Sequence, residues 1–193
     1  MGLQNNIKRG DFFLLNNKNI VVCVCGGIAT YKVVELVSKL KKQRADVHVV
    51  MSESATKFVT PLTFQTISNN LVTISLDDDM GSADINHIVL AQNADLFVVA
   101  PATANIIGKI ANGIADDIIT TSIIATRAQV LMVPAMNTGM FENKIVQNNI
   151  EKLKVYGYEF IDPEIGTMAM KDEKGGVGRF PKTENIISYI LNI

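Results

Sequence analysis

The feature that most constrains the fold of this chain is a regular alternation between short apolar runs and segments with helical spacing. The mostly apolar runs cover residues 20–25, 47–51, 96–100, 130–133 and 158–161. Runs this short and this apolar are typical of strands buried on both faces. Amphipathic patterns predict helices over residues 31–42, 61–67, 104–111, 141–156 and 183–191. Strands that alternate with helices need right-handed crossovers, so the pattern predicts a parallel sheet between two helical layers.

Two further segments complete the expected layout. Asp116 and Asp117 stand at the start of another predicted helix, where carboxylates satisfy free backbone N–H groups and meet the positive end of the helix dipole. Residues 162–182 are rich in glycine and charge, and we expect them to form a loop. Because no repeat or linker is evident, we predict an N-terminal extension over residues 1–18 and a single domain over 19–193.

Composition excludes several classes of function. The 193 residues carry a net charge of −1 without a basic run, so the electrostatic footprint of a nucleic-acid-binding protein is missing. Polar residues interrupt every apolar run well before the length of a membrane span, and the apolar patch near the N-terminus is too short for a signal peptide. Cys23 and Cys25 alternate on one predicted strand, where a disulfide would be distorted, so we expect a reducing, cytoplasmic setting. Two cysteines and two distant histidines make no metal-ligand set.

Two predicted strands end in Pro-Ala, and each is followed by an asparagine. The residues concerned are Pro101, Ala102, Thr103 and Asn105 after the first strand, and Met136, Asn137 and Met140 after the second. Parallel sheets bind ligands at the carboxyl ends of their strands, so the pattern predicts a flat, largely apolar ligand held by a few amides. Either asparagine alone could simply satisfy its own turn, but the two parallel contexts favour ligand binding. We interpret the two methionines mainly as packing residues, although thioethers also suit the face of a flat ring.

The turn after the first strand begins with Gly26 and Gly27. Glycines here let the backbone approach an anion at a helix N-terminus, although the G-x-G-x-x-G spacing of dinucleotide-binding proteins is absent. The second strand is followed by Ser52 and Ser54, whose hydroxyls fit a phosphate better than a nicotinamide ribose. On spacing alone, a mononucleotide phosphate and an ordinary tight turn are both open.

His87 is the better candidate of the two histidines for proton transfer. It follows a loop of acidic residues and precedes an apolar segment, so we expect it at a helix start with its ring free. A capping or surface role is the alternative. His48 lies inside a strand pattern and is interpreted as structural.

Five short motifs follow one another along the chain. They are GGIATYK at 26–32, NHI at 86–88, PATAN at 101–105, IANGIADD at 110–117 and PAMNTGM at 134–140. With these motifs the chain closely resembles the homo-oligomeric flavin-containing cysteine decarboxylases over about residues 19–191. That family includes phosphopantothenoylcysteine decarboxylase of coenzyme A synthesis and the lantibiotic peptidyl-cysteine decarboxylases. Phe141 stands where the family usually has Trp or Tyr.

The resemblance implies an α/β fold of the flavodoxin-like type, a three-layer sandwich with a central parallel sheet, and FMN as the cofactor. The implied FMN contacts are Gly26, Gly27, Ile28, Thr30, Ser52, Ser54, Thr56, Pro101, Ala102, Thr103 and Asn105. The implied catalytic residues are His87, as the base, and Asn137, which would also hold the substrate carboxylate beside Met136, Met140 and Lys171. The family also implies homotrimers that associate into dodecamers, with His87 approaching the flavin of a neighbouring subunit.

The implied activity is FMN-dependent oxidative decarboxylation of a cysteine carboxylate, with phosphopantothenoylcysteine as the first candidate substrate. A peptide that ends in cysteine is the alternative. Phosphopantothenoylcysteine decarboxylases often carry a cysteine in the late glycine-rich loop that helps to form a saturated thiol. Residues 167–172 contain no cysteine, so we expect an enethiol product, with Lys171 as the nearest protic alternative. A flavodoxin-like electron carrier, a flavin prenyltransferase and a non-catalytic FMN protein are rival interpretations.

Overall fold

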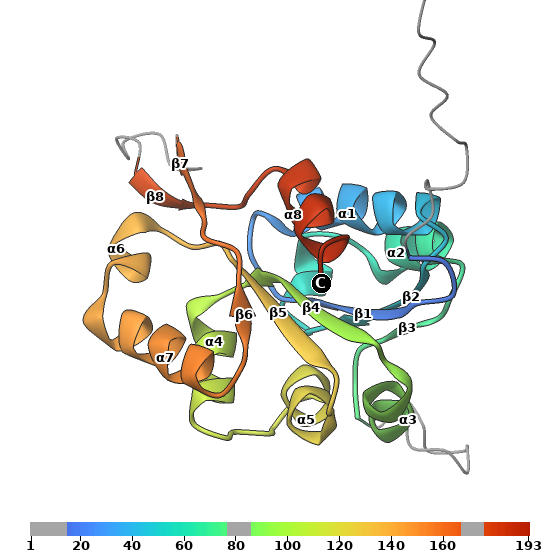
Figure 1. The fold of residues 1–193 in the computed structure, drawn as a ribbon, viewed down its shortest axis with the longest axis horizontal. Coiled ribbons are helices and arrows are strands. Elements are labelled where there is room, and N and C mark those ends of the chain that lie inside the picture. Colours follow the sequence, from blue (N-terminus) through green and yellow to red (C-terminus); the bar gives the residue numbers. More distant parts are fainter. Residues whose placement is uncertain (1–14, 77–85, 167–175) are drawn as a thin grey trace, which may run out of the picture.

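A six-stranded parallel sheet forms the centre of the molecule in the computed structural model, which describes residues 15–76, 86–166 and 176–193. The strands are β1 (Asn19–Val24), β2 (Asp46–Met51), β3 (Val72–Thr73), β4 (Leu96–Ala102), β5 (Gln129–Pro134) and β6 (Glu159–Phe160). Their order across the sheet is β3-β2-β1-β4-β5-β6, and every neighbouring pair is parallel. The α/β three-layer fold predicted from the alternation of elements is therefore confirmed (Figure 1).

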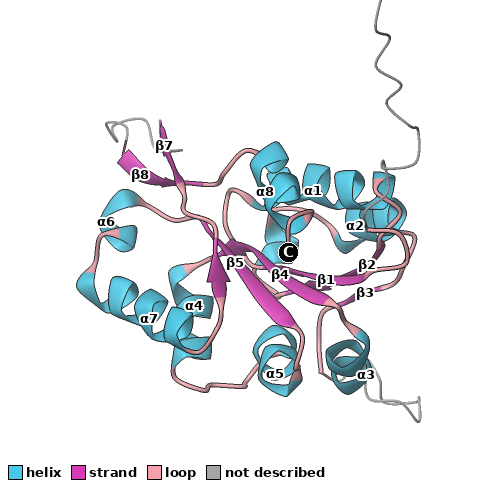
Figure 2. Cartoon of the chain, viewed as in Figure 1, coloured by secondary structure: helices cyan, strands magenta, loops and turns pink. Residues whose placement is uncertain are grey.

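Helices cover both faces of this sheet (Figure 2). One layer contains α1 (Thr30–Lys42), α2 (Pro61–Ser68) and α8 (Thr183–Ile190). The other contains α3 (Asn86–Asn93), α4 (Ala104–Ala111), α5 (Ile118–Ala125) and α7 (Lys144–Val155). Side chains of β1 alternate between the two layers: Val22 packs toward α1, whereas Cys23 packs toward α4 and α5. Because both faces of the strand are buried, it reads as a continuous apolar run.

The order of the strands reverses at β1. The chain runs from β1 outward through β2 to β3, and then returns to place β4 on the other side of β1. Val22 of β1 lies opposite Val49 of β2 and Val98 of β4, so the three strands end near the same level. In open α/β sheets the loops diverge at such a reversal and leave a crevice at the carboxyl ends of the strands.

The helix predicted over residues 141–156 is wrong in its first part, because the structure has two helices there. The short helix α6 (Thr138–Phe141) comes first, and α7 begins at Lys144. Asn143 stands between them, and its Oδ1 accepts a hydrogen bond from the backbone N–H of Ile145 at 2.9 Å. A side chain that caps a new helix in this way favours a break in the preceding one.

The loop predicted over residues 162–182 contains two strands. They are β7 (Glu164–Gly166) and β8 (Gly176–Arg179), which pair in antiparallel fashion beside the main sheet (Figure 1). Glycine content suggested a loop, but a Cβ on Gly166 would lie 2.8 Å from Cδ of Arg179, so this glycine serves close strand packing. Sequence reasoning also missed β3 and ended β4 at residue 100, whereas the strand continues to Ala102.

Cys23 and Cys25 are both free and buried. None of the helices in the described part of the chain combines the length and the apolar character that crossing a bilayer requires.

Candidate functional site

A cavity of about 650 Å³ opens at the carboxyl ends of β1, β4 and β5, where the strand order reverses. Ten of the residues expected at the ligand site line it: Gly26, Gly27, Ile28, Ser54, Pro101, Thr103, Asn105, Met136, Asn137 and Met140. The lining combines backbone turns, apolar side chains and the amides of two asparagines. The volume lies in the range of small-ligand and cofactor sites.

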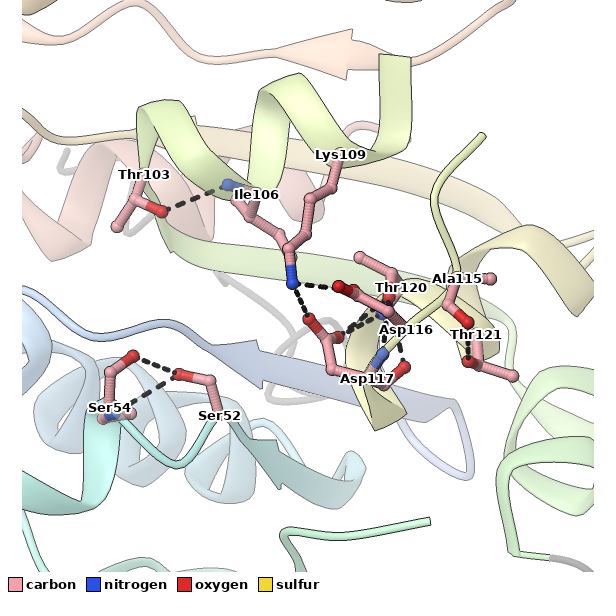
Figure 3. Close-up of polar contacts among 11 residues, drawn as sticks. Ser52, Ser54, Thr103, Ile106, Lys109, Ala115, Asp116, Asp117, Thr120 and Thr121 are labelled. Carbon is pink, nitrogen blue, oxygen red and sulfur yellow. Dashed lines mark hydrogen bonds and ion pairs between the residues drawn. The ribbon is translucent and has the colours of Figure 1, made fainter. Parts of the chain in front are cut away.

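Four other expected residues lie outside the lining and hold the turns that form it. Thr30 is buried, and its hydroxyl lies within hydrogen-bonding distance of the carbonyl oxygens of Cys25, at 3.0 Å, and Gly27, at 2.7 Å. Thr56 donates its hydroxyl to the carbonyl oxygen of Glu53 at 2.7 Å. Ser52 and Ala102 complete the set. Ser52 Oγ lies 3.0 Å from Ser54 Oγ (Figure 3), and the carbonyl oxygen of Ala102 accepts from the N–H of Ala135 at 3.1 Å.

Gly26 lies against the turn that follows β2. A Cβ added to it would lie 2.3 Å from Ser54 Oγ and 2.8 Å from the backbone carbon of Ser54. The φ angle of Gly26 is outside the left-handed region, so the position needs glycine for space and not for backbone conformation. This contact brings the N-terminus of α1 and the Ser54 hydroxyl to one edge of the cavity, which is the arrangement that an anion needs.

Replacing Gly26 by alanine is expected to lower the free energy of unfolding by about 1–3 kcal/mol and to weaken flavin binding, because the β1–α1 turn must move away from Ser54. Thermal unfolding and FMN titration measure the two effects. Gly108→Ala in α4 is the matched control, since its Cβ would have only one ordinary contact, at 3.8 Å. Equal FMN affinity in the two variants would contradict the expected phosphate contact at the Gly26 turn.

The turn after β4 is stabilised by capping contacts. Thr103 is the N-cap of α4, and its Oγ1 accepts from the N–H of Ile106 at 3.3 Å (Figure 3). Lys109, farther along α4, pairs with Asp116 at 2.7 Å and with Asp117 at 2.8 Å. Asp117 also caps α5 by accepting from the N–H of Thr120 at 2.8 Å. The IANGIADD motif therefore ties α4 to the start of α5 and lies outside the cavity lining.

The Asp117 carboxyl is half-buried, and this burial opposes its ionisation. Hydrogen bonds from Lys109 and Thr120 outweigh the burial, so the pKa of Asp117 lies below its usual value. Burial also raises the pKa of the Cys25 thiol to about 12, with the Asp117 charge as the second cause. Cys25 is therefore a neutral thiol at physiological pH and a packing residue.

Asp117→Ala is expected to lower the free energy of unfolding by about 1–2 kcal/mol at pH 7, because it removes a helix cap and a partner of Lys109. Since the folded-state pKa is lowered, the contribution is complete above the usual aspartate pKa of about 3.9 and is lost as the pH falls through the lower folded value. The difference between wild type and variant, measured by denaturant unfolding, should therefore shrink below about pH 4. Asp116→Ala is the control: it removes an exposed ion pair but no cap, and should cost less than about 1 kcal/mol.

Asn137 has a structural role at the cavity wall. It is the N-cap of α6, and its Oδ1 accepts from the N–H groups of Gly139, at 2.8 Å, and Met140, at 3.4 Å. The side-chain oxygen of Asn137 therefore satisfies its own turn, which was one of the two roles expected for this asparagine. This capping fixes the orientation of the amide, and Nδ2 is the group that can donate to a ligand.

His87 does not line the cavity of its own chain. It lies in the first turn of α3, which packs against α5 in the layer opposite α1 (Figure 1). Its Nδ1 is buried and has no hydrogen-bond partner among the described residues. Lys171 falls outside the described part of the chain.

The cavity also contains residues that the sequence did not single out as site residues. Lys32 of α1, Arg179 of β8 and Phe180 all line it. Lys32 is the last residue of the first motif and follows the glycines by about one helical turn. That position is the sequence feature that could have identified it as a site residue. Arg179 could not be placed, because the pairing of β7 with β8 brings it to the cavity.

A family model described as Flavoprotein matches residues 14–193. The chain belongs to the Flavoprotein family. It is 48% identical over 174 residues to the coenzyme A biosynthesis bifunctional protein CoaBC of Bacillus subtilis, covering 90% of this chain and 42% of that protein. The chain thus spans less than half the length of this curated relative.

Solved structures of several decarboxylases share the fold of this chain. A PPC decarboxylase mutant complexed with pantothenoylaminoethenethiol has a TM-score of 0.79 at 27% identity, over 91% of this chain and 97% of that one. The peptidyl-cysteine decarboxylase EpiD has 0.79 at 26%, over 91% and 99%. The FMN-dependent cysteine decarboxylase SpaF has 0.77 at 26%, over 93% and 97%. The resemblance inferred from the five motifs is therefore confirmed.

Proposed function

We propose that this chain is an FMN-dependent decarboxylase that acts on a cysteine carboxylate, with phosphopantothenoylcysteine as its substrate. The observation that carries the proposal is the cavity at the strand-order reversal, which combines the Gly26 turn, Ser54 and the amides of Asn105 and Asn137. Membership of the Flavoprotein family and the likeness to CoaBC and PPC decarboxylase support the same conclusion.

The residues at the cavity fit FMN. The N-terminus of α1, opened by Gly26 against Ser54, suits a phosphate group. Apolar walls from Ile28, Pro101 and Met136 suit a flat ring system. When bound, FMN supplies a two-electron acceptor, which allows oxidation at the thiol-bearing carbon and so gives the carboxylate an easy route to CO₂ loss.

The protein's own part is to bind, orient and move protons. Asn137 Nδ2 is proposed to donate to the substrate carboxylate, since the capping of Oδ1 fixes the amide beside the cavity. Met136 and Met140 would flank the reacting group and limit the access of water. His87 is proposed to take the thiol proton as general base.

Proton transfer by His87 requires a second subunit. His87 lies outside the cavity of its own chain, and its buried Nδ1 has no hydrogen-bond partner among the described residues. We propose a homo-oligomer, a trimer that can associate further into a dodecamer, in which His87 completes the site of a neighbour.

A reducing cytoplasm is the compartment that suits the free Cys23 and Cys25 thiols.

The substrate and product are tested together by mass spectrometry. The FMN-loaded protein is incubated with phosphopantothenoylcysteine and, separately, with a peptide that ends in cysteine. Dissolved oxygen is supplied as the final acceptor of the two hydrogens, so that FMN is oxidised again after each turnover. We expect phosphopantothenoylcysteine to lose CO₂ and two hydrogens, which marks an enethiol, because residues 167–172 contain no cysteine to help return them. Loss of CO₂ alone would instead mean a saturated thiol and another proton donor, with Lys171→Ala as the next variant. Turnover of the peptide alone would contradict the proposed substrate.

A further inference from the structure

Two cationic side chains from distant parts of the sequence meet at the cavity. Lys32 comes from the first turn of α1, and Arg179 is the last residue of β8. Both line the cavity, together with Phe180, whose ring centroid lies 6.0 Å from Lys32 Nζ. The rest of the lining within the described residues contains no acidic side chain. The described lining therefore carries positive charge, although the whole chain has a net charge of −1.

Across residues 15–76, 86–166 and 176–193, neither Lys32 nor Arg179 takes part in an ion pair. Burial lowers the pKa of Lys32, and the charge of Arg179 lowers it further, whereas Glu164 has a smaller, opposite effect. Glu164 Oε1 already accepts from Lys182 N at 2.9 Å and Asn185 Nδ2 at 3.2 Å. Two like charges held near one another in a partly enclosed site favour the binding of an anion.

The cavity lining contains two sets of groups that suit a phosphate. One is the Gly26 turn with Ser54, which supplies backbone N–H groups and hydroxyls but no formal charge. The other is the Lys32–Arg179 pair, which supplies two charges and the forked donors of a guanidinium group. FMN carries one phosphate and phosphopantothenoylcysteine carries another, so two sites are what the proposed reaction needs.

We propose that Lys32 and Arg179 form an anion subsite that binds the phosphate monoester of the substrate. This inference rests on the proposed function, because it assigns the second phosphate to a substrate. The subsite explains how the chain would select a phosphorylated small molecule over a peptide that ends in cysteine. The carboxylate end meets Asn137, and the phosphate end meets the cationic pair.

Calorimetric titration of the FMN-loaded protein tests the subsite without requiring turnover. The probes are 4′-phosphopantothenate and pantothenate, which differ only in the phosphate. The wild type is expected to bind the phosphorylated probe about tenfold to a hundredfold more tightly, and added salt should reduce this preference. Lys32→Gln and Arg179→Gln should each reduce the preference, and the double variant should abolish it. Lys152→Gln, an exposed lysine of α7, is the matched control and should keep the preference.

Three results would overturn the subsite. The wild type could bind both probes equally or bind neither. The double variant could keep the preference for the phosphorylated probe. The variants could instead weaken FMN relative to riboflavin, measured by flavin fluorescence, which would assign the pair to the cofactor phosphate. Decarboxylation is assayed separately, so a protein that prefers the phosphorylated probe but releases no CO₂ would contradict the proposed function and leave the anion subsite standing.

Discussion

Replacing His87 by asparagine is expected to lower the turnover number about 10²–10⁴-fold while FMN binding stays unchanged. This range is the usual contribution of a general acid or base, and asparagine keeps much of the size of histidine but cannot accept the proton. FMN affinity should change little, because His87 is proposed to take the thiol proton, whereas Gly26 and Ser54 are proposed to hold the FMN phosphate. Turnover with phosphopantothenoylcysteine and flavin fluorescence titration measure the two quantities.

His48→Asn is the matched control for this variant. His48 lies on β2, and its Nε2 is 3.3 Å from Asp46 Oδ2, away from the cavity. The His48→Asn variant should keep a turnover number within about twofold of that of the wild type. A His87→Asn protein that keeps turnover within about tenfold would rule out general-base catalysis by this residue. Mixed oligomers of His87→Asn and Asn137→Asp subunits should regain part of the activity, because some sites would then combine two intact residues.

Replacing Asn137 by aspartate is expected to lower kcat/KM about a hundredfold or more with little effect on stability. Aspartate also caps helices well, so the hydrogen bonds to the N–H groups of Gly139 and Met140 can be kept. The change removes the Nδ2 donor, and a hydrogen bond from such a donor to a charged group contributes about 1.5–3 kcal/mol. It also places a second carboxylate beside the substrate carboxylate, and the two negative charges repel each other. Steady-state kinetics and thermal unfolding separate the two roles.

The control for this substitution is Asn143→Asp. Asn143 caps α7 in the same way that Asn137 caps α6, with Oδ1 accepting from the N–H of Ile145 at 2.9 Å. Because it does not line the cavity, the variant should keep normal kinetics and a similar melting temperature. If Asn137→Asp loses stability but keeps kcat/KM, Asn137 is only a helix cap.

Much of the fold could be predicted because buried strands leave a clear signal. Every residue of β1, β4 and β5 except Asn19 and Gln129 is buried, so these strands appear as apolar runs. The edge strand β3 has two half-buried residues and left no such signal. The break between α6 and α7 depends on the competing caps Asn137 and Asn143, which an amphipathic pattern does not register.

The site could be predicted where its residues directly follow neighbouring strands of the parallel sheet. Gly26 and Ser54 follow strands that end at the same level, so their proximity followed from the parallel sheet. Arg179 was missed because its place depends on the β7–β8 pairing beside the sheet. His87 was singled out from its expected place at a helix start, and the resemblance implied that it acts at the flavin of a neighbouring subunit. The packing of α3 against α5 shows where it lies in its own chain. The domain limits, including the extension over residues 1–18, stay predictions.

Release of CO₂ from phosphopantothenoylcysteine tests the proposed decarboxylation most directly. Protein loaded with FMN is compared with the same protein after FMN removal, and CO₂ is measured against substrate consumed. We expect one CO₂ for each substrate molecule with FMN bound, and none above the protein-free rate after its removal. FMN-saturated protein that releases no CO₂ from phosphopantothenoylcysteine or from a peptide ending in cysteine would contradict the assignment of this chain as a decarboxylase.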